Sequence, residues 1–184
     1  MYSTVMTSML CGIRAIPVQV EVDISTGLPA FEMVGYLSSE VREAKERVRT
    51  ALHNCGVSLP AKRITINLSP GNVRKTGTGF DLPIAVALLS AIGVLDEMCS
   101  RQKVFVGELN LSGQLLPVNG ILPVVSDGCR DGVHTDFIIP MDNLAEGELV
   151  RDASVYGFSS LEAVIAYLRG GAYEKPALTM LSAE

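Results

Sequence analysis

Residues 63–94 read RITINLSPGNVRKTGTGFDLPIAVALLSAIGV and predict a strand, a loop and a core helix in succession. Apolar and polar side chains alternate over 63–68, which is typical of a strand with one buried face. Residues 69–79 are rich in Gly, Pro, Asn and Thr, the composition of a loop. Residues 82–94 are apolar nearly all round, so we expect this helix to lie inside the core, with Asp81 as its N-cap.

Three further strands are predicted upstream of this passage. Residues 16–24 alternate cleanly between apolar and polar side chains, which indicates a half-buried strand. Residues 2–9 and 31–34 are runs of residues with high strand propensity and are predicted as strands too. The N-terminal part of the chain therefore supplies most of a sheet.

An amphipathic helix is predicted between the last of these strands and residue 63. Ser38 or Ser39 can cap its start, and Gly56 ends it. Glu43 and Arg47 are four residues apart and are expected to pair on its exposed side. Its apolar face consists of Val41, Ala44, Val48, Ala51 and Leu52.

The C-terminal half mixes short strands with helices. The expected elements are a strand at 104–109, a tight turn, a returning strand at 115–118, a helix at 120–131, strands at 137–139 and 155–158, and a last helix capped by Ser160. Helices and strands mix without alternating strictly, so we predict the α+β class, a mixed sheet with packed helices.

The composition is that of a single folded domain. The chain has 184 residues, of which 48% are hydrophobic and 19% charged, and this argues against a disordered chain. We expect one domain over residues 1–171, and residues 172–184 are interpreted as a linker because they show no pattern. No apolar run reaches the roughly 18 residues that span a bilayer, and the N-terminus lacks the pattern of a signal peptide. We therefore expect a cytoplasmic protein with no membrane partner.

The cysteines do not suggest a metal site. No two of them form a Cys-x-x-Cys pair, whereas metal sites usually include at least one close pair. Only His53 and His134 could add imidazole ligands. The sequence thus predicts reduced, mostly buried thiols at Cys11, Cys55, Cys99 and Cys129.

The charges are unevenly distributed. The net charge is −5, but residues 40–75 hold eight cations and three anions, and the rest of the chain holds seven cations and seventeen anions. A basic region on an acidic body indicates an oriented surface. Solvated helix charges would explain part of it. The alternative is a surface that contacts DNA phosphates without reading the base sequence, and its candidate residues are Lys62, Arg63, Arg74 and Lys75.

Aromatic residues are scarce near this basic region. Tyr2, Tyr36 and Phe80 are the nearest to the relevant loops in sequence. Single-stranded nucleic acids are usually bound with bases stacked on aromatic rings. The sequence therefore does not predict a base-stacking platform.

Two motifs resemble Lon-type protease domains. Residues 106–120 read VGELNLSGQLLPVNG and are similar to the Gly-Glu-(Ile/Leu)-x-Leu-x-Gly hairpin of that family; the C-terminal domain of RadA proteins has a similar pattern. Residues 77–83, GTGFDLP, correspond to the segment that enters the core helix of those domains.

Other stretches resemble the start of ComM/YifB proteins, which are Mg-chelatase-like ATPases. They are GLPAFEMVG at 27–35, EAKERVR at 43–49, PAKRITINLSP at 60–70 and FDLPIA at 80–85. The resemblance implies a fold of the Lon-protease and ribosomal-protein type. It also implies a hexameric AAA+ ATPase domain later in the same chain, where ATP and Mg would bind, with no cofactor in this part. Self-association in a ring and a link to DNA branch migration during natural transformation are implied as well.

The resemblance allows a test for catalytic residues. Lon proteases use a Ser-Lys dyad, in which the lysine takes the serine proton. Matching the motifs places Gly79 at the serine position and Val124 at the lysine position. Neither side chain can donate or accept a proton, so we expect a domain without a catalytic site of its own.

Three other hypotheses remain open. Thr76 or Thr78 could act with Lys75 as a divergent peptidase, although threonines here are more readily explained as shaping a glycine-rich turn. The loop lacks the Gly-Lys-(Ser/Thr) order of a P-loop, but its amides could hold an anion loosely. The chain could also be a free-standing interaction module of the RadA type.

Overall fold

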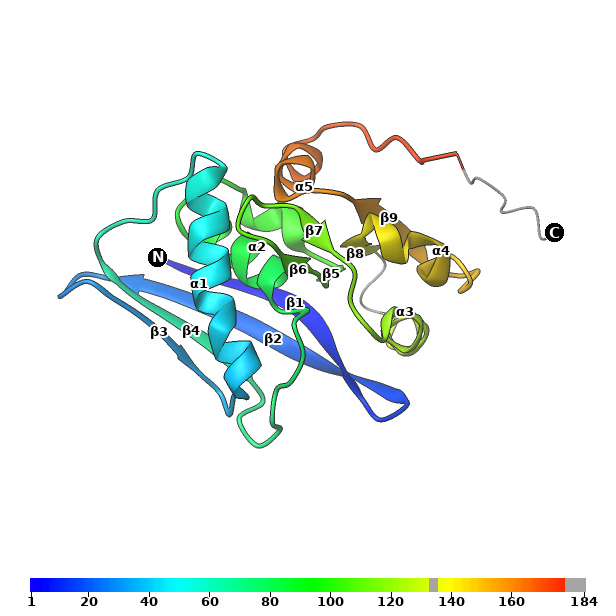
Figure 1. Cartoon of the computed structure of the whole chain (residues 1–184), viewed down its shortest axis with the longest axis horizontal. Helices are drawn as coiled ribbons and strands as arrows, with labels where there is room; N and C mark the ends of the chain where they lie inside the picture. Colours follow the sequence, from blue (N-terminus) through cyan, green and yellow to red (C-terminus); the bar gives the residue numbers. More distant parts are fainter. Residues whose placement is uncertain (133–135, 178–184) are drawn as a thin grey trace.

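The computed structural model describes residues 1–132 and 136–177. Seven strands form one mixed sheet in the order β3-β4-β2-β1-β5-β8-β9, and two short strands form a separate hairpin, β6-β7 (Figure 1). The strands of the main sheet are β1 (Tyr2–Cys11), β2 (Arg14–Ser25), β3 (Ala30–Val34), β4 (Arg63–Ser69), β5 (Lys103–Phe105), β8 (Asp136–Pro140) and β9 (Ser154–Phe158). The hairpin consists of β6 (Glu108–Leu109) and β7 (Leu115–Leu116).

The sheet has an antiparallel centre and parallel flanks. β1 pairs antiparallel with β2 along its whole length, and β2 pairs antiparallel with β4. β3 joins β4 in parallel at one edge, and β5, β8 and β9 continue from β1 in parallel toward the other edge. This mixed sheet with packed helices confirms the α+β class.

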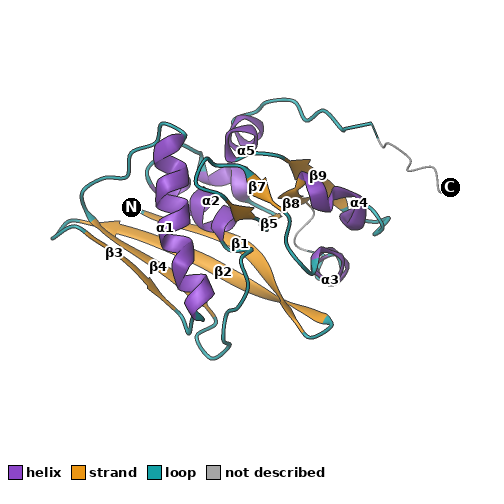
Figure 2. Ribbon diagram, viewed as in Figure 1, coloured by secondary structure: helices purple, strands orange, loops and turns teal. Residues whose placement is uncertain are grey.

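Five helices pack around the sheet (Figure 2): α1 (Ser39–Asn54), α2 (Asp81–Ala91), α3 (Ile121–Gly128), α4 (Leu144–Gly147) and α5 (Leu161–Leu168). Two 3-10 turns, Glu97–Ser100 and Met141–Asn143, complete them. Every residue of α2 except Ser90 is buried, as its all-round apolar sequence predicted. α1 buries the face that its spacing predicted, and Ser38 caps it by accepting a hydrogen bond from the Val41 amide.

Two apolar cores share the strands of the sheet. Alternate residues of a strand point to opposite faces. Phe105 and Ile138 therefore enter the large core with α1 and α2, whereas Val104 and Phe137 enter a smaller core with α3. Because β5 and β8 are buried on both faces, a short apolar run is a sufficient signal for each.

The start and end of α2 differ from the prediction. Asp81 is not the N-cap: Phe80 holds that position, and the Asp81 carboxylate is buried instead. The helix ends at Ala91, before the predicted residue 94. Gly93 has a φ of 80°, and the Val94 amide donates to the Leu89 carbonyl at 2.9 Å, which is the hydrogen bond of a Schellman C-cap.

The strand predicted at 104–109 is interrupted. β5 ends at Phe105, and β6 begins at Glu108. Between them, the Gly107 amide donates to the Gly79 carbonyl and the Gly107 carbonyl accepts from the Leu82 amide, both at 3.0 Å. Gly107 thus bonds to the entrance of α2 and not to a neighbouring strand.

Two more elements are shorter than predicted. β7 ends at Leu116, because the buried side chain of Asn143 binds both backbone groups of Val118, at 2.9 and 3.0 Å. α3 ends at Gly128, three residues before the predicted end. The strands predicted at 2–9, 16–24, 31–34 and 63–68 are confirmed and extend slightly beyond those limits.

The segment after α5 has no helix or strand up to Ala177. Tyr173 nevertheless packs with Tyr156, Phe158 and Tyr167, and its hydroxyl accepts from the Gly157 amide at 3.0 Å. Residues 178–184 of the predicted linker, like His134, lie outside the described residues. Among the described helices, none is long and apolar enough to cross a membrane.

Candidate functional site

The two positions matched to a protease dyad line the same pocket. Gly79 lies just before α2, and Val124 lies in α3, 45 residues further along the chain. Together with Met9 of β1 and Asn119 they face a cavity of about 360 Å³. The sequence motifs therefore identified two segments that the fold brings together.

The walls at these two positions are apolar and closely packed. A Cβ added to Gly79 would lie 2.9 Å from Cγ1 of Val106 and 3.9 Å from Cγ1 of Val118. Its carbonyl accepts a hydrogen bond from Gly107, which fixes the loop against that segment. The Val124 side chain is buried. The pocket thus has neither a nucleophile nor a base at the places where a Lon-type dyad requires them.

Glu40 occupies the amide that could have attracted an anion. Its Oε1 accepts from the Gly77 amide at 2.7 Å, at the rim of the pocket. The buried carboxylate of Asp81 adds a second negative charge at the start of α2. The chain's own carboxylates therefore fill the positive end of this helix, and the loop does not fit a nucleotide phosphate.

Lys75 lies inside the protein, so its assignment to a DNA-contacting surface is wrong. The residue is 0% exposed, and its Nζ donates to the carbonyl of Gly35 at 2.7 Å and to the carbonyl of Pro70. Burial lowers the pKa of the Lys75 ammonium. The backbone of Lys75 bridges to the same turn, since its amide donates to Tyr36 at 2.9 Å. Lys75 therefore fastens the 69–79 loop to the turn after β3.

The ammonium of Lys75 is engaged by these carbonyls and not by a threonine. Both the amide and the hydroxyl of Thr76 are directed to the sulfur of Met9, at 3.2 and 3.9 Å. Thr78 lines the pocket beside Gly79. The arrangement provides no hydrogen bond from either threonine to the proposed base.

The other three predicted DNA contacts are exposed but do not form one cluster. Lys62 and Arg63 lie at the start of β4, where Arg63 pairs with Glu32 at 3.2 Å. Arg74 lies beyond the other end of this seven-residue strand. At about 3.3 Å per residue, the length of the strand separates Arg63 from the Arg74 loop by about 20 Å.

A buried ion pair between α1 and α2 was not predicted. Arg47 donates to Asp81 through Nε at 2.8 Å and through Nη2 at 3.1 Å, and the Leu109 amide donates to the same carboxylate at 3.0 Å. Burial raises the pKa of Asp81 to about 6, against the opposing effect of Arg47. The predicted pair with Glu43 exists at 3.7 Å, but it is the secondary contact of Arg47. The signal that could have revealed the buried pair was a carboxylate at the start of an otherwise apolar helix.

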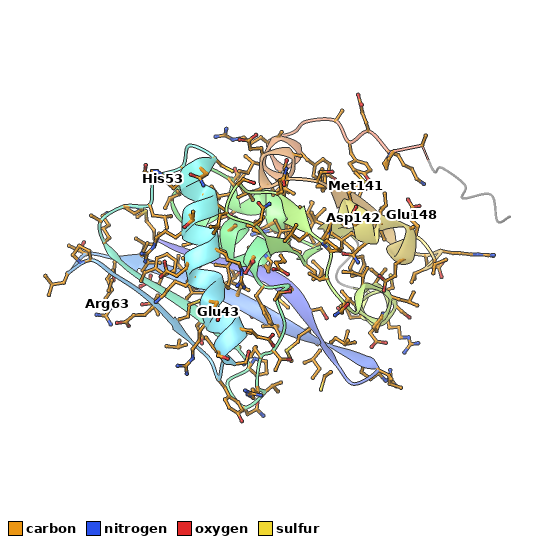
Figure 3. All side chains as sticks on the ribbon, viewed as in Figure 1. Glu43, His53, Arg63, Met141, Asp142 and Glu148 are labelled. Atoms are coloured by element: carbon orange, nitrogen blue, oxygen red, sulfur yellow. The ribbon has the colours of Figure 1, made fainter. Side chains whose placement is uncertain are left out.

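A second hollow lies between the C-terminal half of α1 and the start of β3. Its volume is about 730 Å³. The guanidinium of Arg49 lies 4.8 Å from the centre of the Phe31 ring, in a cation–π contact. Figure 3 shows His53 near the end of α1 and Arg63 on the sheet beside it. Phe31 was not among the aromatic residues considered from the sequence, and of those, Phe80 is buried.

The cysteines and histidines do not come together. In the parts of the chain that the structure describes, no group of three His, Cys, Asp or Glu residues could hold a metal ion. The four thiols are free; Cys11 is exposed and the other three are partly exposed, so the expected burial of these thiols is only partial.

Comparisons with known proteins agree with the motifs. The family model described as subunit ChlI of Mg-chelatase matches residues 20–143. The competence protein ComM of Haemophilus influenzae is 41% identical over 159 residues, covering 86% of this chain and 31% of its own length. YifB of Escherichia coli is 41% identical over 175 residues, covering 95% of this chain and 34% of its own length.

More distant similarity extends to the two other families suggested by the motifs. The DNA repair protein RadA of Streptococcus pneumoniae is 30% identical over 97 residues, 53% of this chain and 22% of RadA. Lon protease 1 of Bacillus subtilis is 29% identical over 131 residues, 67% of this chain and 16% of the protease. The chain spans about a third of the length of the more similar relatives.

Proposed function

We propose, from the premise that this chain belongs to the Mg-chelatase-like family that includes ComM and YifB, that it is a non-catalytic accessory domain with a Lon-type fold. In this proposal it works in the cytoplasm beside an AAA+ ATPase domain of the same protein. That domain binds ATP and Mg, and the chain described here helps it to assemble as a ring and to engage DNA. The relative named a competence protein suggests a role in the uptake or processing of DNA.

The observation that supports this most directly is the pocket at Gly79 and Val124. Two segments far apart in sequence meet there, yet the side chains at the two meeting points are a hydrogen atom and an isopropyl group. A preserved fold without proton-transferring groups at its centre favours a structural role for the domain. Because Lys75 is held by two carbonyls, it also supports the view that the nearby threonines lack a base.

A protease assay tests the non-catalytic assignment. The purified protein is incubated at high concentration with unfolded, fluorescently labelled casein, and we expect no peptide release above that of buffer. Release that disappears in a Thr78→Ala variant would establish the peptidase hypothesis and overturn the accessory role.

We further propose that Lys62, Arg63 and Arg74 contribute contacts to DNA phosphates in the complete protein. All three are exposed and cationic, although they lie at two places along β4. Each lost phosphate contact should reduce the slope of log affinity against log salt by about 0.9. Combined charge reversal of the three should therefore lower the slope by about 3, measured by fluorescence anisotropy with duplex DNA. An unchanged affinity and slope would show that these cations are only solvated.

A further inference from the structure

β3 is an edge strand whose outer side is unpaired. It is the last strand on its side of the sheet, and within residues 1–132 and 136–177 no strand pairs with its outer edge (Figure 1). The Ala30 amide donates inward to the Lys62 carbonyl at 3.4 Å. Because backbone groups alternate in direction along a strand, the amides and carbonyls of Phe31 and Met33 point outward. This edge can therefore accept another strand.

Exposed apolar side chains flank the same strand. Leu28 is 88% exposed, Val34 is 46% exposed and Tyr36 is 58% exposed. All three lie within nine residues of sequence around β3. A concentration of exposed apolar residues at a free strand edge is typical of an interaction surface.

The hollow beside α1 lies next to this edge and has a cationic rim. Alternate residues of β3 share a face, and Phe31 faces α1, as its contact with Arg49 shows. Among the described residues that line the hollow, none is Asp or Glu. Its apolar lining includes Phe31, Leu59 and Ile64, and its cationic or basic lining consists of Arg49, His53 and Lys62.

The cations continue along α1. Arg42 and Lys45 precede Arg49 by seven and four residues, so the three share one face of the helix. Arg49 itself is available to a partner, because its contact with Glu46 is only 4.0 Å and half its side chain is exposed. A carboxylate placed along this stripe would meet several positive charges and no lining carboxylate.

We propose that β3 and the adjacent hollow form a docking site for an acidic, extended peptide segment of a partner protein. The segment adds to the outer edge of β3 as a new strand and bonds with the backbone of Phe31 and Met33. Its alternate apolar side chains enter the 730 Å³ hollow, and its carboxylates face Arg49 and Lys62. This combination of main-chain pairing with pockets for alternate side chains is the β-augmentation mode of peptide recognition.

A peptide fits the site better than a single-stranded nucleic acid. The Arg49 guanidinium already covers a face of the Phe31 ring, so this ring offers no open platform for a base. Leu59 and Ile64, on the remaining apolar wall, are aliphatic. The outward backbone groups of β3 pair with another backbone, which a nucleic acid lacks. The site is separate from the pocket at Gly79 and does not depend on the proposed accessory role.

Fluorescence anisotropy with three labelled probes tests the proposal. The probes are a dodecapeptide of alternating Leu and Glu, the same peptide with Lys in place of Glu, and a single-stranded oligonucleotide of matched charge. We expect the wild-type protein to bind the Glu peptide at least tenfold more tightly than either of the other two. Equal binding of the oligonucleotide, or of the Lys peptide, would overturn the assignment.

Two pairs of variants separate charge from strand pairing. Arg49→Glu should weaken binding of the Glu peptide about tenfold, whereas Arg74→Glu, the same charge change beyond the far end of β4, should leave it unchanged. Met33→Pro removes an outward amide from an edge strand, where proline is tolerated, and Met33→Ala removes the side chain but keeps the amide. Binding lost in Met33→Pro and retained in Met33→Ala supports strand addition. Equal affinities in these two variants, with circular dichroism spectra like that of the wild type, would contradict it.

Discussion

Arg47 and Asp81 depend on each other because both leave water when α1 packs against α2. The Asp81 side chain is 0% exposed and that of Arg47 is 19% exposed, and two hydrogen bonds join them. Removing one partner of such a pair leaves a charge without compensation in the interior. Lys75 is in a comparable position, since its ammonium has only carbonyl partners among the hydrogen bonds of the described chain. Single residues that look like surface charges in the sequence are thus structural in the fold.

Arg47→Ala should lower the free energy of unfolding by about 3 kcal/mol, because it leaves the Asp81 carboxylate buried and unpaired. Urea denaturation at pH 7.5 measures this. Arg42→Ala, a truncation at an exposed position of the same helix, is the control and should change stability by less than about 0.5 kcal/mol. Equal effects of the two substitutions would show that the pair does not stabilise the helix contact.

Lys75→Ala should lower the free energy of unfolding by about 2 kcal/mol, because two buried carbonyls lose their donor. Lys62→Ala, at an exposed position, should be nearly neutral. The same denaturation experiment compares them. A neutral Lys75→Ala variant would contradict the fastening of the 69–79 loop described above.

Helices and strands with a long periodic signal were predictable, whereas their ends depended on tertiary contacts. α1, α2, β2 and β4 follow from alternation or helical spacing within the sequence. The break between β5 and β6 does not, because it depends on Gly107 bonding to the entrance of α2. In the same way, the motifs located Gly79 and Val124 in one pocket, but nothing local distinguished buried Lys75 from exposed Lys62. Burial of a charge is a property of the assembled elements.

The C-cap of α2 offers a direct test of backbone conformation. Gly93 has a φ of 80°, and a Cβ there would meet no atom within 4 Å, so any cost of a side chain arises from the backbone alone. Gly93→Ala should therefore destabilise the protein by about 1 kcal/mol. Gly71→Ala, equally open but without a positive φ, should be close to neutral in thermal denaturation. A neutral Gly93→Ala variant would mean that α2 can end in another way.

The whole molecule separates its charges between two sides. α1 and the start of β4 form the cationic side, where Figure 3 labels His53 and Arg63, and Asp142 and Glu148 lie on the opposite side. The net charge is −5, so the cationic side stands out against an acidic body. The buried carboxylate of Asp81 lies between these surfaces, and its titration affects the stability of the entire fold.

Stability should therefore depend on pH through Asp81. Its folded-state pKa of about 6 lies above the model value of 3.8, so the native state binds this proton more tightly than the unfolded state. The contribution is present below about pH 4 and is lost as the pH rises to about 6, by up to ~3 kcal/mol. The stability of the wild type relative to Asp81→Asn should fall over this window and stay level above pH 7. Urea denaturation at intervals from pH 4 to 8 measures it, and a constant difference would exclude a raised pKa.

The enclosed amine of Lys75 also makes the protein chemically selective. Amine-reactive reagents modify lysines only when Nζ is accessible and deprotonated, and Lys75 is 0% exposed whereas Lys62 and Lys175 reach solvent. Acylation of Lys75, followed by mass spectrometry, should proceed only as fast as the 69–79 loop detaches from the turn at Gly35. Lys75 is thus a built-in clock for the opening of the segment that borders the central pocket.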